Sequence, residues 1–309
     1  MNTKVTNKII AILVARMGSS RIPGKSILNI NGNPLLKIIL QNLLDIKGID
    51  KLIVATSYLK EDDIIEKISK ESKVECFRGD SENVLDRVFL AAKKYSADII
   101  VEVGGDCPFI GADILDPAIE FFLKKNFDYL CNYEPPTYPE GFDINIIKIE
   151  ALEKAYKNAF APSQRVHPFS YLSFHREEFK IGNINYNNCD LSNFHWSLDF
   201  PEDIKFVQKV YEKLCNQKPS IEKILNLINE DKDLLDLHNK LLRPQVEHSF
   251  WNAPSIIKDM NDDISYLVTL GKKSIQLKDF SKANHIYSEI KIICNELKAY
   301  SECMLKNSF

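Results

Sequence analysis

The feature that most constrains this chain is the repeated alternation of short apolar runs and charged, amphipathic stretches over residues 9 to 132. The runs are apolar throughout and have the length of strands, which is typical of strands buried in a parallel sheet. We predict strands over residues 9–15, 52–55, 74–77, 98–103 and 129–132. We predict helices over residues 34–46, 61–72, 81–95 and 114–125, with Ser81 as the N-cap of the third. Helices between such strands cover both faces of a sheet, so the predicted fold class is a doubly wound, mostly parallel α/β domain.

The alternation stops at residues 133–145, where three prolines and a glycine predict an ordered surface loop. Beyond it we predict a strand over 144–149, a helix over 150–158 and a late strand over 195–198. A helix over 201–214 follows, with Pro201 at its first position, where the missing N–H costs little.

The character of the chain changes near residue 242, so we expect one domain over residues 1–242 and a C-terminal extension over 243–309. Residues 243–255 contain two prolines and are predicted to be a linker. Residues 256–306 are charged and helical in pattern, and we favour a helical hairpin packed on the domain. The alternative is a tetratricopeptide-like unit built on Leu270, Gly271, Ala283 and Tyr287, but a single unit lacks the neighbours that a solenoid needs.

Composition excludes several classes of protein. The net charge is −3, which argues against a dedicated nucleic-acid binder. The longest early apolar run has seven residues, far short of the roughly 20 that span a bilayer. Seven cysteines occur without a C-x-x-C spacing, so we expect neither a zinc ribbon nor a redox pair. The expected compartment is the reducing cytoplasm, without membrane insertion.

The strongest functional signal is the loop after the first strand, residues 15–25 (ARMGSSRIPGK). Ligands of doubly wound sheets bind at the carboxyl ends of the strands. The loop combines backbone and hydroxyl donors with three cations, which would repel one another in the absence of an anion. It is neither a Walker A loop, whose spacing differs by one residue, nor a dinucleotide G-x-G-x-x-G. We therefore predict a phosphate site, and its candidate residues are Ala15, Arg16, Gly18, Ser19, Ser20, Arg21 and Lys25.

Two aspartates that follow apolar runs are candidate magnesium ligands. Asp106 lies in the segment GGDCP directly after the fourth strand, and Asp199 precedes the helix at 201–214. Mg²⁺ prefers carboxylate oxygens and keeps waters and substrate phosphates as further ligands, so two aspartates are sufficient. The alternative for Asp199 is a helix N-cap, and the sequence leaves this choice open.

Two further regions carry weaker signals. Arg165 and His167, with Asp143 from the proline-rich loop, are candidates for binding an anionic acceptor. Asp86 and Arg87 are candidates for recognising the base or ribose of a nucleotide; the alternative is helix capping by Asp80 or Ser81 with an intrahelical Asp–Arg network. Cys107 is not predicted to be a nucleophile, because the neighbouring carboxylate raises the pKa of its thiol.

These segments together resemble one family. They are ARMGSSRIPGK (15–25), FRGDSENVLDR (77–87), VGGDCPFI (103–110), YPEGFDIN (138–145), SQRVH (163–167) and WSLDFPED (196–203). In this order they resemble the spore-coat polysaccharide cytidylyltransferases, relatives of the CMP-sialic acid and CMP-Kdo synthetases. The resemblance implies a Rossmann-like nucleotidyltransferase fold, a triphosphate held by the first loop, and Mg²⁺ held by Asp106 and Asp199.

The chain departs from the expected pattern near the acceptor. The resemblance leads us to expect a basic residue and a threonine before GDCP, where this chain has Glu102 and Gly104. It also leads us to expect an acidic residue where this chain has Val166, and residues 168–170 differ as well. The identity of the acceptor is therefore the least transferable part of the resemblance.

The resulting hypothesis is Mg²⁺-dependent transfer of CMP from CTP to a small anionic sugar or phosphorylated acceptor, in surface polysaccharide biosynthesis. Arg16, Lys25 and Asp106 are the expected catalytic residues. One alternative is a glycosyltransferase that consumes a nucleotide sugar, but the single Asp-x-Asp triplet, 231–233, lies in a charged helical stretch. The others are use of a different NTP and a non-catalytic nucleotide-binding scaffold. A homodimer and a protein partner for the tail are also left open.

Overall fold

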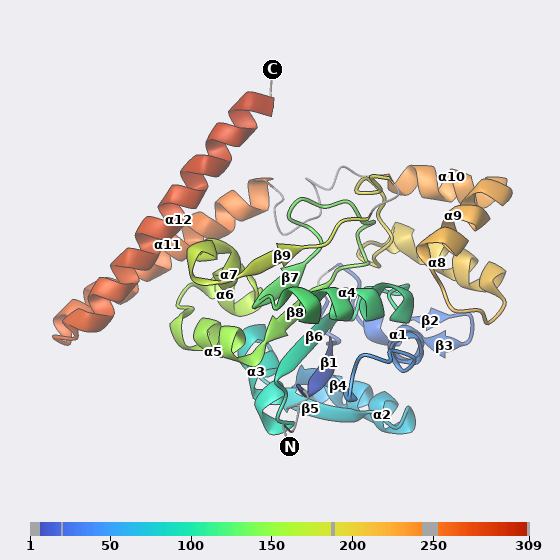
Figure 1. Ribbon diagram of the computed structural model, residues 1–309, viewed down its shortest axis with the longest axis horizontal. Helices are drawn as coiled ribbons and strands as arrows, with labels where there is room; N and C mark the ends of the chain where they lie inside the picture. The colour runs from blue at the N-terminus through green and yellow to red at the C-terminus, as the bar shows by residue number, and fades with distance from the viewer. Residues whose placement is uncertain (1–6, 20, 187–188, 243–252, 308–309) are drawn as a thin grey trace.

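The computed structural model describes residues 7–19, 21–186, 189–242 and 253–307 (Figure 1). Its centre is a seven-stranded sheet in the order β5-β4-β1-β6-β8-β7-β9. The strands are β1 (Ile9–Val14), β4 (Lys51–Ser57), β5 (Glu75–Gly79), β6 (Ile99–Gly104), β7 (Tyr129–Cys131), β8 (Asn145–Lys148) and β9 (Ile181–Asn183). A separate two-stranded sheet pairs β2 (Asn29–Ile30) with β3 (Asn33–Pro34).

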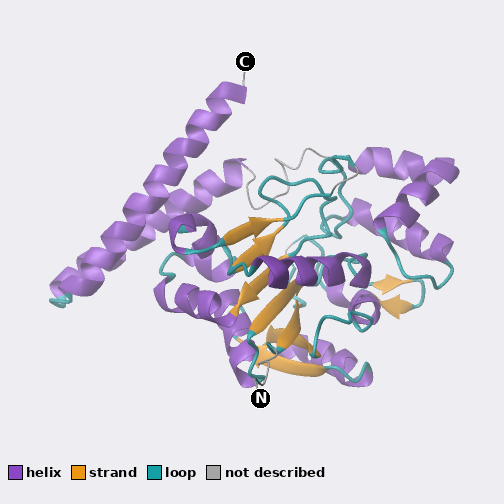
Figure 2. Cartoon of the chain, in the orientation of Figure 1, coloured by secondary structure: helices purple, strands orange, loops and turns teal. Residues whose placement is uncertain are grey.

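Helices cover both faces of the large sheet, as Figure 2 shows. The domain contains α1 (Leu35–Leu43), α2 (Asp63–Glu71), α3 (Val84–Lys94), α4 (Ala112–Lys125), α5 (Ile149–Asn158), α6 (Pro162–Val166), α7 (Ser170–Phe174), α8 (Pro201–Leu214), α9 (Ile221–Glu230) and α10 (Lys232–Leu241). Short 3₁₀ turns occur at Lys25–Ile27, Lys60–Asp62 and Arg176–Glu178. Among the described residues no helix is long and apolar enough to cross a membrane.

The two faces of β1 show how the sequence produces these layers. Side chains alternate along a strand, so Ala11 and Leu13 pack with α1, α2, α4 and α8 on one face. Ile10 and Ile12 pack with α3 and α5 on the other. Both faces are buried, which explains why the strand is apolar throughout. The predicted fold class is therefore confirmed.

One strand runs against the others. β1, β4, β5 and β6 pair in parallel, but β8 is antiparallel to both β6 and β7. The amino end of β8 consequently lies at the same edge of the sheet as the carboxyl ends of β1 and β6. This places the loop before β8 beside the loops after β1 and β6.

Two local predictions are wrong. Residues 195–198 form no strand; a single β-bridge joins His195 to Glu140. Ser81 is not the N-cap of α3, because the Asp80 carboxylate accepts the backbone N–H groups of Glu82 and Asn83 and delays the helix. Asn83 is the N-cap, and its side chain accepts the N–H of Asp86.

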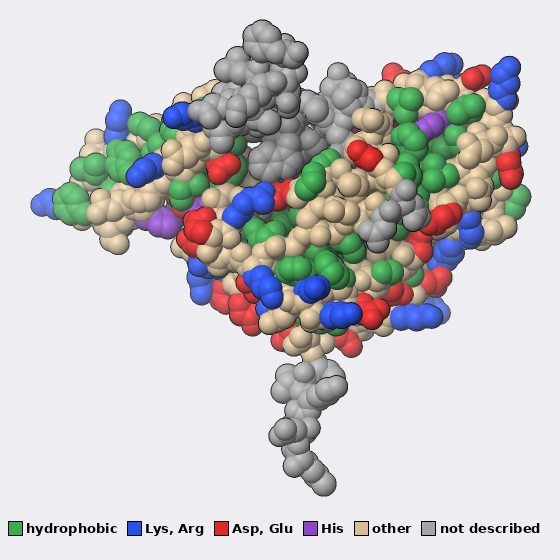
Figure 3. Space-filling model, turned by 45° about the horizontal axis from the view of Figure 1, so that its top comes forward, with side chains coloured by type: hydrophobic (Ala, Val, Ile, Leu, Met, Phe, Trp, Pro, Cys, Tyr) green, Lys and Arg blue, Asp and Glu red, His purple; other side chains and the backbone are tan. Residues whose placement is uncertain are grey.

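The C-terminal helices α11 (Ala253–Gln276) and α12 (Phe280–Asn307) form the predicted hairpin, which projects from the body in Figure 1. Its surface carries apolar side chains between lysines (Figure 3). The predicted linker at 243–255 lies outside the described residues except for its last three, which begin α11. The base of the hairpin packs on α6 and α7.

Candidate active site

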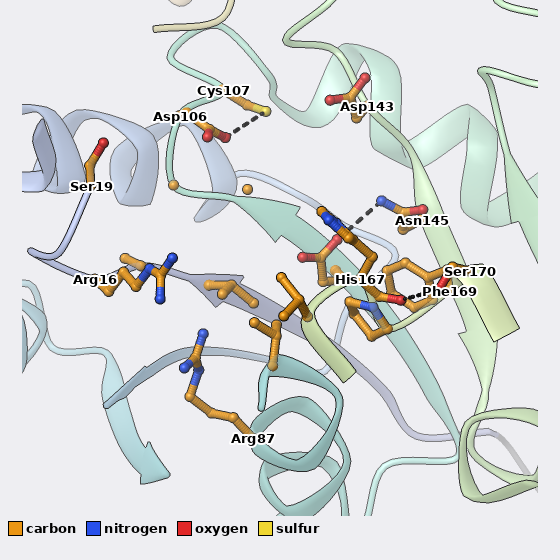
Figure 4. Close-up of a pocket in the computed structure, with 18 of the residues that line it drawn as sticks. Arg16, Ser19, Arg87, Asp106, Cys107, Asp143, Asn145, His167, Phe169 and Ser170 are labelled. Carbon is orange, nitrogen blue, oxygen red and sulfur yellow. Dashed lines mark hydrogen bonds between the residues drawn. The ribbon is translucent and has the colours of Figure 1, made fainter. Parts of the chain in front are cut away.

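A cavity of about 510 Å³ opens at the edge of the sheet where β1 and β6 end and β8 begins. Residues from four loops line it, and Figure 4 shows many of them. The predicted site residues that line it are Ala15, Arg16, Ser19, Arg21, Lys25, Arg87, Asp106, Asp143 and His167. The cavity therefore gathers residues that are up to 159 positions apart in the sequence, from Val14 to Ser173.

The first loop is held in place by a buried carboxylate that the sequence analysis missed. Asp62 is 1% exposed, and its Oδ1 accepts the backbone N–H of Met17 at 2.7 Å. Its other oxygen accepts the Ser57 hydroxyl. The Ser26 hydroxyl donates to the carbonyl of Arg16 at 3.1 Å. These bonds fix the loop as it leaves β1, so its cations are held at the cavity.

The loop after β6 lies directly against the end of β1. The N–H of Gly105 donates to the carbonyl of Val14 at 2.9 Å. A Cβ at position 105 would come within 2.8 Å of that same oxygen, so only glycine allows this approach. The contact brings Asp106 to the first loop.

Lys25 joins the two predicted metal ligands. Its Nζ lies 2.7 Å from Asp106 Oδ2 and 3.7 Å from Asp199 Oδ1. Burial would lower the pKa of Lys25, but the two carboxylates outweigh it and the pKa is raised. Burial likewise opposes ionisation of Asp106, yet Lys25 holds the pKa of that carboxyl below its usual range. Arg21 Nη2 contacts Asp199 Oδ1 at 2.8 Å.

This donor set suits Mg²⁺. Asp106 and Asp199 direct hard oxygen atoms toward one ammonium group, which already occupies the position of a cation between them. Within the described part of the chain no group of three or more His, Cys, Asp or Glu side chains could hold a metal. Two protein carboxylates match an ion that takes its other ligands from waters and phosphates.

Asp199 is not the N-cap of α8. The capping role belongs to Asp203, whose Oδ2 accepts the backbone N–H groups of Asp199 and Phe200 at 2.9 and 2.7 Å. The Asp199 carboxylate is thereby free to accept the Ser197 hydroxyl at 2.6 Å on Oδ2 and to face Arg21 and Lys25 with Oδ1. This geometry excludes the capping alternative.

A buried histidine, His195, helps to fix the position of Asp199. His195 Nδ1 lies 2.9 Å from Glu140 Oε2, and its Nε2 lies 3.2 Å from the Ser197 hydroxyl. Burial would lower the pKa of His195, but hydrogen bonds to Asp203 and Glu140 raise it to about 9. The imidazolium therefore links the loop of Glu140 to Asp199. No sequence motif marked Glu140 or His195 for this role.

Arg87 forms part of the cavity wall. Its side chain is fully buried, and Nη1 donates to the carbonyl oxygens of Asp80 and Ser81 at 2.6 and 3.3 Å. Its Nε has no hydrogen-bond partner in the structure. Burial and the nearby Arg16 lower the pKa of this guanidinium. A buried cationic donor without a partner is suited to an acceptor atom of a ligand.

Other predicted residues lie elsewhere. Asp86 and Arg165 do not line the cavity. They meet at Tyr156, which donates to Asp86 and lies with its ring centroid 5.8 Å from the Arg165 guanidinium carbon. Gly18 also lies outside the cavity lining, and Ser20 lies outside the described residues.

His167 lines the opposite wall, across from Arg16 in Figure 4. Burial lowers the pKa of His167, so it is a neutral imidazole near pH 7. Asp143 also faces the cavity, and burial among other carboxylates raises its pKa well above the usual range. This wall is therefore less cationic than the sequence analysis expected.

The hairpin of α11 and α12 contacts the segment that forms the wall at His167. Ser163, at the start of α6, donates its backbone N–H to Asp263 of α11 at 3.1 Å. His175, after α7, contacts Glu289 of α12 at 3.0 Å, and both side chains are 3% exposed. The wall residues 166–170 lie between these two anchors. The hairpin thus buttresses the side of the cavity that faces Arg16.

Two alternative sites receive no support from the geometry. Asp231 caps α10 and, with Asp233, pairs with lysines of α8; neither aspartate lines the cavity. The Cys107 thiol contacts Asp106, and burial followed by that carboxylate raises its pKa well above the usual value. The structure therefore favours neither the glycosyltransferase motif nor a thiol nucleophile.

Comparisons with known proteins agree with this geometry. Residues 10–243 match the family model described as cytidylyltransferase. The spore coat polysaccharide biosynthesis protein SpsF of Bacillus subtilis is 29% identical over 239 residues, 74% of this chain and 96% of SpsF. A 3-deoxy-manno-octulosonate cytidylyltransferase of Trichlorobacter lovleyi is 35% identical over 116 residues, 38% of this chain and 45% of that enzyme.

Among solved structures, a cytidylyltransferase from Leptospira borgpetersenii superimposes with a TM-score of 0.72 and 30% identity, over 76% of this chain and 98% of that one. The matched region contains the cavity and every residue described in its wall, whereas the hairpin lies beyond the family model. The chain therefore belongs to the cytidylyltransferase family of nucleotidyltransferases.

Proposed function

We propose that this protein catalyses Mg²⁺-dependent transfer of CMP from CTP to a small anionic sugar or phosphorylated acceptor, with release of pyrophosphate. The observation that carries the proposal is the meeting of Arg16, Arg21, Lys25 and Asp106 at one cavity, with Asp199 beside it in contact with Arg21 and Lys25. A triphosphate needs several cationic donors, and its metal needs carboxylate oxygens, so this combination suits phosphoryl chemistry.

The ion pairs of the site suggest how the triphosphate binds. Lys25 and Arg21 are held by Asp106 and Asp199, and phosphate oxygens would compete for the same two cations. Arg16 is 41% exposed at its side chain, where it lies 3.7 Å from the exposed Glu82 and donates to the Ser81 carbonyl, and a phosphate would compete for these contacts. Arg87 offers its unpartnered Nε to the nucleoside part of the same ligand. We assign these four side chains to CTP.

The residues named act by positioning and by charge. An acceptor oxygen attacks the α-phosphorus and pyrophosphate leaves from the opposite side, as in other phosphoryl transfers. Lys25 and Arg16 stabilise the negative charge that develops on pyrophosphate. Asp143 and His167 orient the acceptor from the wall across the cavity. Mg²⁺ bound by Asp106 and Asp199 would supply further charge neutralisation at the phosphates.

The relatives guide the choice of acceptor and pathway. The names of two of them refer to a spore-coat polysaccharide and to 3-deoxy-manno-octulosonate, an acidic sugar. By similarity we propose an acceptor of this chemical class and a role in the synthesis of a surface polysaccharide, in the cytoplasm.

The test is pyrophosphate release from CTP and Mg²⁺ in the presence of 3-deoxy-manno-octulosonate, sialic acids and sugar phosphates, one at a time. We expect acceptor-dependent release, and a loss on the order of 10²-fold in Lys25→Ala. Lys47→Ala, at an exposed position, is the matched control. Release that is independent of every acceptor, or full activity of Lys25→Ala, would contradict the proposal.

A further inference from the structure

Glu102 of β6 places a carboxyl group in the cavity wall, at a position held by the sheet itself. It is paired in register with Asn145 of β8, whose Nδ2 donates to Glu102 Oε2 at 3.1 Å. This bond is drawn from Asn145 in Figure 4. The carboxyl is thus fixed between two strands rather than carried on a mobile loop.

The direction of this hydrogen bond is set by two tyrosines. The hydroxyls of Tyr129 and Tyr133 lie 2.7 and 2.8 Å from Asn145 Oδ1 and are hydrogen-bonded to each other, so one of them donates to that oxygen. An amide oxygen that accepts a hydroxyl leaves the amide nitrogen as the donor toward Glu102. Asn145 therefore holds one oxygen of Glu102, and the structure gives no partner for the other.

No cation neutralises this carboxyl. Among the residues that the structure describes, no Lys, Arg or His lies within ion-pair distance of Glu102. Burial, with a smaller contribution from Asp106, raises the pKa of Glu102 to about 7, although the hydrogen bond from Asn145 and the charge of Arg87 oppose the rise. Asp143 lines the same cavity. A half-buried carboxyl without a cation is costly unless a ligand supplies a donor.

The two sides of the cavity therefore differ in charge. Arg16, Arg21 and Lys25 lie on the side of the first loop, which we assign to the triphosphate. Glu102 lies on the strand next to β1, hydrogen-bonded to Asn145, and lines the same cavity as His167. A second anionic group of a ligand would be repelled there, whereas an ammonium or hydroxyl group would satisfy the free oxygen.

We propose that Glu102 binds a hydrogen-bond donor of the acceptor, an ammonium or a hydroxyl group, and excludes acceptors that present an anion at this point. The inference rests on the proposed function, because it assigns this wall to the acceptor. At this position the resemblance leads us to expect a basic residue, whereas this chain has the acidic Glu102. Because the charge of the side chain is reversed, we expect the charge of the group that it recognises to be reversed as well.

The experiment compares the wild type with Glu102→Gln and Glu102→Arg, all saturated with CTP and Mg²⁺. The probes are glucosamine, glucose, glucuronate and 3-deoxy-manno-octulosonate, and binding is measured by saturation-transfer NMR. Glu120→Arg, an exposed position on α4, controls for the added charge. Stabilisation by CTP is recorded for every protein, so a failure of nucleotide binding is separated from a failure of this inference.

We expect the wild type and Glu120→Arg to give the same ratio of sugar-acid binding to glucosamine and glucose binding. Glu102→Arg should shift the ratio toward the acids by at least about tenfold. If Glu102→Gln loses binding of glucosamine more than of glucose, the recognised group is an ammonium; equal losses indicate a hydroxyl. The inference is overturned if CTP stabilises the wild type, Glu102→Gln and Glu102→Arg and these three proteins rank the probes in the same order, or bind none of them.

Discussion

At the scale of single residues, the proposed phosphate site depends on Lys25 and on the two carboxylates that form ion pairs with its ammonium group. Asp106 contributes the 2.7 Å contact, and Asp199 the longer one. Such a group can exchange partners when a polyanion enters, because Lys25 gains phosphate oxygens as it releases carboxylates. Ser197 and His195 hold Asp199 from the side opposite its ion pairs, because Ser197 donates to Asp199 Oδ2 and contacts His195 Nε2.

Replacing Asp106 by Ala should lower turnover far more than stability. The carboxylate is 36% exposed at its side chain, so its loss leaves no large void, while the site loses one of the two carboxylates that we propose as Mg²⁺ ligands. We expect pyrophosphate release at saturating CTP to fall on the order of 10²-fold or more. Thermal unfolding of the same variant is the companion measurement. Asp45→Ala, at an exposed residue, is the control, and full Mg²⁺-dependent activity of Asp106→Ala would contradict the assignment.

Residue types near the site could be predicted, but their partners could not. Asp106, Asp199 and Lys25 stand out because each follows a strand or lies in a glycine-rich loop. Asp62, Glu140 and His195 do not, because their roles come from contacts across 45 to 55 positions of sequence. Asp86 and Arg165 carry charge at suggestive positions, yet Tyr156 binds both away from the cavity. Long-range contacts of this kind leave no local pattern.

At the scale of elements, the short helices α6 and α7 depend on the hairpin. Each has five residues, too few to be stable alone. Ala161 and Phe174 pack in one apolar cluster with Met260, Leu267 and Ile286 of the hairpin. This cluster holds the wall that contains His167.

Replacing Asp263 by Ala should weaken this attachment. Asp263 is 2% exposed and accepts both the N–H and the hydroxyl of Ser163, so its loss leaves buried donors without partners. We expect a loss of about 1–3 kcal/mol in the free energy of unfolding. Urea denaturation measures it. Asp262→Ala, exposed on the same helix, should change little, and an equal effect of the two variants would contradict the anchoring role.

Attachment of the hairpin should also weaken at alkaline pH. Burial would lower the pKa of His175, but Glu289 and the carbonyl of Tyr171 outweigh it and raise the pKa above 6.5. The ion pair therefore contributes fully below pH 6.5, and its contribution is lost as the pH rises through the folded-state pKa. We expect the difference in Tm between the wild type and Glu289→Gln to be larger at pH 6 than at pH 9. A difference that does not change with pH would contradict this.

Helices and strands of the first half could be predicted because apolar spacing determines them locally. The direction of β8 could not, because the same apolar run fits a parallel or an antiparallel neighbour. Residues 195–198 look like a strand, but Trp196 and Leu198 are buried in the core without strand pairing of that segment. Burial alone therefore produced the strand-like pattern.

At the scale of the whole molecule, the sheet brings one cavity together from distant segments. The parallel order of β1 and β6, with β8 reversed, places three loops at one edge. The family match ends at residue 243, and the hairpin that follows buttresses the acceptor wall from outside it. A segment outside the family match therefore supports one wall of the cavity.

The most direct test of the central claim is thermal unfolding of the protein with Mg²⁺ and each of the four NTPs. A ligand at 100 times its Kd stabilises the native state by about 2.7 kcal/mol. We predict that CTP stabilises the wild type more than the other three nucleotides do. Lys25→Ala should lose most of this stabilisation, and Lys47→Ala should keep it. Equal stabilisation by all four nucleotides, or by none, would contradict it.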